Sequence, residues 1–96
     1  MSSKSPESEE LIDNFIDELW LEKGLSQNTL SAYRQDISTF NKWLKNTHLL
    51  EVTKIELLEY LAYRLKKGYS SRSTARSLSS LRALFNQLSN KYNLKE

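Results

Sequence analysis

The sequence has no cysteine, a single histidine, one proline and two glycines among its 96 residues. Without cysteine, disulfides, thiolate metal sites and a cysteine nucleophile are excluded. A single histidine, His48, excludes a multi-histidine metal site, and no glycine-rich phosphate-binding motif is present. Proteins built from many short strands need turn residues about every 8–12 positions. The small number of Gly and Pro residues therefore argues against a β-sandwich or barrel. We therefore expect no catalytic residue, no metal and no cofactor in this chain.

Long hydrophobic runs are also lacking. No segment approaches the roughly 20 apolar residues of a membrane span, and the polar start at Met1 does not resemble a signal peptide. Hydrophobic residues still make up 39% of the chain and the net charge is only +2, which together favour one modest core over disorder. The length fits a single domain. We expect a small intracellular all-α domain without membrane contact.

Four amphipathic segments predict four helices. The first begins near Pro6 with Ser5 as a possible cap and ends near Gly24, and the second begins at Ser26 and ends near residues 46–48. Their apolar positions recur at helical spacing. The predicted buried residues are Leu11, Ile12, Phe15, Ile16, Leu19 and Trp20 in the first helix, and Leu30, Tyr33, Ile37, Phe40 and Leu44 in the second, with Trp43 on its flank.

The third helix is expected to begin at a capping box formed by Thr53 and Glu56 and to end at Gly68. The fourth begins after Ser70 or Ser71 and continues to about Asn90. The predicted buried residues are Ile55, Leu58, Leu61, Ala62 and Leu65 in the third helix, and Thr74, Leu78, Leu81, Leu84, Phe85 and Leu88 in the fourth. Helices joined by short loops predict a compact four-helix bundle.

Charge is divided unevenly along the chain. Residues 1–62 carry six Lys/Arg and eleven Asp/Glu, which sum to −5, whereas residues 63–96 carry eight and one, which sum to +7. The carboxylates concentrate before Lys23. A molecule with one negative and one positive side attracts polyanions through its positive side, although a basic half can also be an ordinary solvated surface.

The outward faces of the second and fourth helices decide between these readings. Asp36 is the only acid from Lys23 to Leu50, and no acid occurs from Ala62 to Lys95. The outward residues are Asn28, Ser31, Gln35, Ser38, Thr39 and Lys42 on the second helix, and Arg72, Arg76, Ser79, Ser80, Ala83 and Gln87 on the fourth. Arginine can bind phosphate or guanine, and glutamine suits adenine. Since no aromatic residue lies on either face to stack bases, double-stranded DNA is favoured over single-stranded.

Two segments carry a family resemblance. Residues 19–37 (LWLEKGLSQNTLSAYRQDI) and residues 71–85 (SRSTARSLSSLRALF) resemble the N-terminal domain of XerD-type tyrosine recombinases, and the likeness extends over about residues 8–92. The string Leu-Trp-Leu-Glu-Lys favours the XerD type over the XerC type. The resemblance implies a SAM-like core-binding domain that forms half of a clamp around duplex DNA, with its second and fourth helices at the major groove.

This resemblance also implies a set of DNA-contacting residues. They are Thr29, Ser31, Arg34 and Gln35 on the second helix, and Arg72, Arg76, Ser79 and Arg82 on the fourth. Helical spacing independently supports five of them and adds Asn28; it places Arg34 and Arg82 at the edges of the faces, where phosphate contacts are expected, and Thr29 nearer the buried side. The family's catalytic tyrosine, arginines, lysine and His-x-x-Arg motif are not found here, so we expect this chain to bind DNA without cutting it.

The resulting domain assignment has three parts: a disordered tail at residues 1–6, a core-binding domain at 7–92, and the start of a linker to a catalytic domain at 93–96. The resemblance implies a role in chromosome dimer resolution in the cytoplasm, associated with the nucleoid. Its expected partners are a recombination half-site, the C-terminal catalytic domain and other XerC/XerD-type subunits in a tetramer. The alternative is a protein–protein interaction module whose acidic first helix binds a basic partner.

Overall fold

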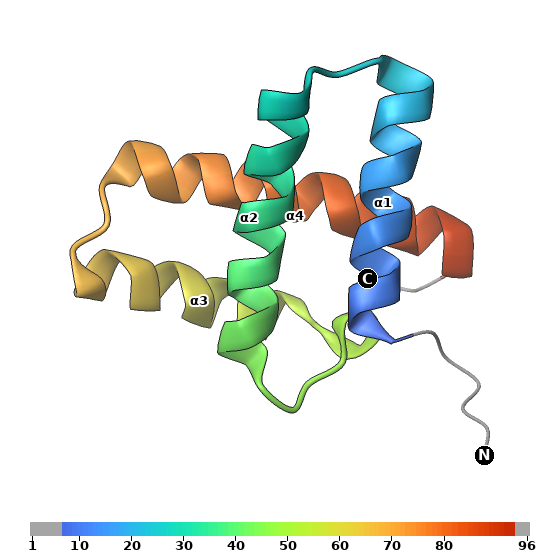
Figure 1. The fold of residues 1–96 in the computed structure, drawn as a ribbon. Coiled ribbons are helices and arrows are strands. Elements are labelled where there is room, and N and C mark those ends of the chain that lie inside the picture. Colours follow the sequence, from blue (N-terminus) through green and yellow to red (C-terminus); the bar gives the residue numbers. More distant parts are fainter. Residues whose placement is uncertain (1–6, 94–96) are drawn as a thin grey trace.

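In the computed structural model, which describes residues 7–93, the chain forms four α-helices and one short 3-10 helix. They are α1 (Ser8–Lys23), α2 (Gln27–Leu44), η1 (Leu49–Glu51), α3 (Lys54–Lys67) and α4 (Ser71–Tyr92). Within that range no strand occurs, so the all-α four-helix prediction is confirmed. Figure 1 shows two antiparallel pairs, α1 with α2 and α3 with α4, which cross each other steeply.

Most helix ends follow the predicted signals. Gly24 ends α1 in the left-handed conformation (φ 61°), and Gly68 does the same for α3 (φ 97°). The hydroxyl of Ser26 accepts the backbone N–H of Thr29 (3.2 Å) and caps α2. Thr53 and Glu56 form the predicted capping box of α3.

Of the two candidate caps for α4, Ser70 is the one used: its hydroxyl accepts the backbone N–H of Ser73. The helix continues to Tyr92 and ends at Asn93 in the left-handed conformation. The predicted tail at residues 1–6, with its Ser5 cap and Pro6, and the linker residues 94–96 lie outside the described residues.

The core lies where the two helix pairs cross. Its fully buried residues are Ile12, Ile37, Phe40, Leu49, Leu81, Leu84 and Leu88. Phe40 is central, because its ring contacts those of Trp43, Tyr60 and Phe85 at centroid distances of 5.9, 4.9 and 6.2 Å. Burial of these apolar surfaces holds α2 against α3 and α4.

The predicted buried face of α3 is wrong. Most of it is exposed: Ile55, Leu58 and Leu65 expose 64, 58 and 51% of their surface, and Ala62 is exposed as well. Only Leu61 is partly buried, and the helix instead buries Tyr60 and Arg64, with Leu57 partly buried beside them. Hydrophobicity favours the first stripe, but the aromatic rings of α2 and the hydroxyls of α4 select the second.

Ala83, predicted to face outward, packs partly buried against the core, and three more side chains also depart from the predicted pattern. Trp20 is 55% exposed although its neighbour Leu19 is buried, because its side chain points from the flank of α1 and not from the buried stripe. Ser80, predicted to face outward, is buried with its hydroxyl bonded to Asp36. Gln87, also predicted outward, is partly buried and donates to Glu18 of α1.

Candidate nucleic-acid interface

A buried carboxylate joins α2 to α4. Asp36 of α2 is 4% exposed and accepts two hydrogen bonds from the guanidinium of Arg76: Nη2 donates to Oδ1 (2.7 Å) and Nε to Oδ2 (3.2 Å). The hydroxyls of Ser80 (2.9 Å) and Ser77 (3.4 Å) donate to the same carboxylate. A buried charge is tolerated only when paired and hydrogen-bonded, and here α4 supplies every one of these partners.

This pairing fixes the charge of the surface above it. Asp36 is the only acidic residue of α2, and α4 has none. Because Arg76 neutralises Asp36 from the exposed side, the outward faces of both helices present no free carboxylate. The hydrogen bonds from Arg76 and its attraction to Asp36 raise the pKa of the guanidinium above its ordinary value, so it stays charged.

Arg76 retains capacity for a second acceptor. Its side chain is 59% exposed, and the bonds to Asp36 use two of the five guanidinium N–H donors. The remaining three can donate to a ligand oxygen. Arg76 therefore serves both as a structural residue and as a candidate phosphate contact.

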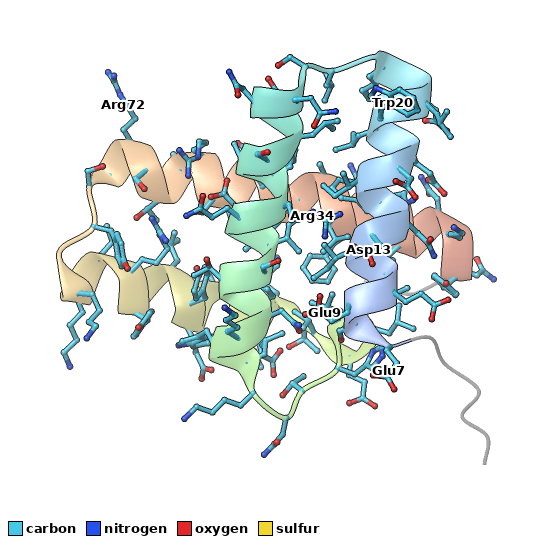
Figure 2. All side chains as sticks on the ribbon, in the orientation of Figure 1. Glu7, Glu9, Asp13, Trp20, Arg34 and Arg72 are labelled. Atoms are coloured by element: carbon cyan, nitrogen blue, oxygen red, sulfur yellow. The ribbon has the colours of Figure 1, made fainter. Side chains whose placement is uncertain are left out.

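The other predicted site residues gather around this crossing. Gln35 precedes Asp36 in the chain, and Arg72 and Ser79 lie one turn to either side of Arg76 on the same helix. Figure 2 shows Arg72 pointing away from the body of the molecule at the start of α4. The exposed members of the predicted set are Asn28, Thr29, Ser31, Gln35, Arg72, Arg76, Ser79 and Arg82.

Two predicted site residues, Arg34 and Thr29, lie at positions that differ from the rest of the set. Arg34 is partly buried at the edge of α2 that faces α1, where Nη1 donates to Asp13 Oδ1 at 2.7 Å (Figure 2). An exposed ion pair of this kind contributes little, so Arg34 can exchange Asp13 for a phosphate. Thr29 is exposed, contrary to its predicted place near the buried side, because the core begins one residue later at Leu30.

The resulting surface, which we call the α2/α4 face, consists of Asn28, Ser31, Gln35, Arg72, Arg76 and Ser79. Amide and guanidinium groups can read base edges in a major groove, and small serines allow a close backbone approach while donating to phosphate oxygens. No aromatic residue belongs to this face. The chemistry suits a duplex better than unpaired bases.

Sequence reasoning missed the Asp36 cluster. The available signal was the pair Ser77 and Ser80, which lies beside the apolar stripe of α4 at a spacing of three residues. Two small hydroxyls next to a core indicate a buried polar partner, and the single acid of the facing helix is the natural one.

Neither a metal centre nor a membrane span is found within residues 7–93. No three His, Cys, Asp or Glu side chains gather there closely enough to hold a metal ion. None of the helices in this range combines the length and apolar character that crossing a membrane requires. His48 is a partly buried loop residue, as predicted, and its Nδ1 accepts the backbone N–H of Leu50 at 3.0 Å.

The sequence is similar to one known domain family and to several curated recombinases. A family model described as the N-terminal SAM-like domain of phage integrases matches residues 12–91. Tyrosine recombinase XerD of Pseudomonas aeruginosa is 51% identical over 77 residues, which cover 78% of this chain and 26% of that protein. XerD of Shewanella oneidensis is 44% identical over 88 residues, which cover 90% of this chain and 29% of that protein.

The chain thus spans about a quarter of the length of the curated relatives it matches. No solved structure matches it. The predicted resemblance to XerD-type recombinases is confirmed by these identities, and the four helices agree with the SAM-like description. The chain belongs to the phage integrase N-terminal SAM-like domain family.

Proposed function

We propose that this chain binds double-stranded DNA through the α2/α4 face, as the clamp domain of a site-specific tyrosine recombinase. Its task is positioning: contacts to phosphates hold the domain on the duplex, and a few contacts to bases bias it toward one half-site. The carboxylate-free α2/α4 face, with Asp36 buried beneath Arg76, is the observation that carries the proposal.

The distribution of acids supports this orientation. Asp13 and Asp17 lie exposed on α1, and Figure 2 shows Glu7, Glu9 and Asp13 along that helix, away from Arg72. Repulsion from these carboxylates disfavours approach of a duplex from the α1 side, while the opposite side attracts it. The domain therefore has one preferred face for a polyanion.

The family supports the wider role. The relatives are named tyrosine recombinases, and their length leaves room for a catalytic domain beyond the part matched here. We propose that the whole protein acts in the cytoplasm as part of a tetramer of XerC/XerD-type subunits, exchanging strands at a chromosomal dimer-resolution site. In that assembly the present chain contributes binding and no chemical step.

The test is binding of a labelled random-sequence duplex, measured by fluorescence anisotropy over a salt series that starts at low ionic strength. Neutralising one phosphate releases about one counterion, so Arg72→Ala should weaken binding and flatten the slope of log K against log salt by about one. Lys54→Gln removes an exposed charge at the first turn of α3, outside the face, and should leave the slope unchanged.

A protein–protein module would give a different result. If the chain is such a module, the wild-type protein would not bind the duplex at low salt. Arg72→Ala would then have no more effect on binding than Lys54→Gln. A preference for one recombination half-site over random duplex, reduced by Gln35→Ala, would support the base contacts.

A further inference from the structure

A groove of about 650 Å³ opens between the end of α2, the second half of α3 and the loop that precedes α4. Its walls combine cationic and aromatic side chains: Lys42, Lys45, Trp43, Tyr60, Arg64 and Tyr69. No acidic residue lines it. The volume falls within the roughly 300–1,000 Å³ of typical ligand sites.

Arg64 is a buried cation without a carboxylate partner. It is 6% exposed, yet its guanidinium donates only to hydroxyls, from Nη2 to Ser73 (2.7 Å) and from Nε to Thr74 (3.3 Å). It also lies over the ring of Tyr69, 4.2 Å from the centroid. The ion pairs found within residues 7–93 involve Arg34, Arg76 and Lys91 instead. A buried charge without an opposite charge is costly, and an anion in the groove would offset that cost.

A second buried polar group lines the same groove. The Tyr60 side chain is 3% exposed, and its hydroxyl donates to no acceptor. Burial raises the pKa of this phenol, so it keeps its proton, while a hydrogen bond from the Arg64 guanidinium to its oxygen partly opposes the rise. The O–H of a buried hydroxyl nearly always donates to an acceptor, so one that does not, beside an uncompensated arginine, indicates a missing acceptor.

Helical spacing and chain adjacency place the rim of the groove near the α2/α4 face. Lys42 follows Gln35 by seven residues, or two helical turns, and thus lies on the same side of α2 about 10 Å further along. Tyr69 directly precedes Ser70, the cap of α4, and Arg72 follows in the first turn. A duplex seated on the α2/α4 face would carry its sugar-phosphate backbone across the mouth of the groove.

We propose that this groove is a phosphodiester subsite, which takes one backbone phosphate at the margin of the bound duplex. Lys42 and Lys45 attract the phosphate at the rim, and Arg64 and the Tyr60 hydroxyl donate to its oxygens from below. The proposal rests on the proposed DNA binding and adds residues that the α2/α4 face does not include. A free phosphate ion shares this chemistry and is the other possible source.

The decisive variant is Tyr60→Phe, because it removes one hydroxyl and no charge. Losing a hydrogen bond to a charged acceptor should weaken duplex binding about tenfold, whereas the thermal stability of the free protein should change little, since the O–H has no acceptor there. Tyr33→Phe is the matched control: this partly buried ring contacts Phe15 on the α1 side and does not line the groove. It should leave binding unchanged.

The Arg64 side-chain Nε–H resonance reports the site directly. It should shift when the duplex is added to the wild-type chain, and much less when inorganic phosphate alone is added at equal ionic strength. If Tyr60→Phe binds the duplex as tightly as Tyr33→Phe does, or if inorganic phosphate alone saturates the Arg64 shift, the backbone subsite is refuted while DNA binding by the α2/α4 face stands. If the wild-type chain binds no duplex, both proposals fail together.

Discussion

Replacing Arg76 with alanine tests the junction beneath the α2/α4 face. The change leaves the Asp36 carboxylate buried with only the hydroxyls of Ser77 and Ser80 as donors. Breaking a fully buried ion pair costs about 3–5 kcal/mol, and breaking an exposed one costs about 0–1 kcal/mol. This pair lies between those limits, because Asp36 is 4% exposed and the Arg76 side chain is 59% exposed.

We therefore expect Arg76→Ala to lower the free energy of unfolding by about 2 kcal/mol. For a domain of this size that corresponds to a fall in Tm of about 8–16 °C. Arg72→Ala removes the same charge one turn earlier, from an exposed side chain, and should change stability by less than about 0.5 kcal/mol.

Urea unfolding of the two variants, together with Asp36→Asn and the double variant, gives the coupling energy between Arg76 and Asp36. We expect Arg76→Ala to lower the free energy of unfolding by less when Asp36 is already neutral. Equal stability of Arg76→Ala and Arg72→Ala, or strict additivity with Asp36→Asn, would refute the reasoning.

Three further predictions concern other parts of the molecule. Ser26→Ala should lower stability by about 1 kcal/mol in urea unfolding, because α2 loses its N-cap, and an unchanged midpoint would contradict this role. Hydrogen bonds from Gln87 and Lys91 lower the pKa of Glu18 in the folded protein below its ordinary value of 4.5. The stability that ionised Glu18 contributes is therefore fully present above about pH 4.5, and it is lost as the pH falls through the lowered pKa of the folded state. The stability difference between wild type and Glu18→Gln should accordingly shrink on acidification, and a constant difference would contradict the link. Asp13→Asn frees Arg34 and should tighten duplex binding about two- to fivefold at low salt, whereas unchanged affinity would place Arg34 away from the phosphates.

The helices and their ends were predictable because their signals are local. Ser26, Gly24, Gly68 and the Thr53–Glu56 box each act within one turn of the chain, and the structure uses all of them. The buried faces of α1 and α2 followed from spacing for the same reason, apart from Trp20, which is exposed on the flank of α1, and Asp36, which is buried on α2.

The face of α3 was not predictable from hydrophobicity. Tyr60 and Arg64 are less apolar than Ile55 and Leu58, and they are buried because α2 offers aromatic rings and α4 offers hydroxyls. These partners lie between 9 and 20 residues away along the chain, so no local pattern reveals them.

The candidate site was partly predictable. Its exposed residues follow from helical spacing and from the near absence of acids on α2 and α4. The pairing of Asp36 with Arg76 joins positions 40 residues apart, and it depends on how the two helices cross. Sequence alone counted Asp36 as an exception to the acid-free surface, whereas its burial is what makes that surface acid-free.

Backbone amide shift mapping during titration with a short duplex at low salt tests the central claim most directly. We predict that the largest shifts fall on α2 around Gln35 and on the first turns of α4 around Arg72 and Arg76, with α1 unaffected outside the turn that carries Asp13. Shifts concentrated on the acidic α1, or none at all at concentrations where the duplex is in excess, would contradict DNA binding by the α2/α4 face.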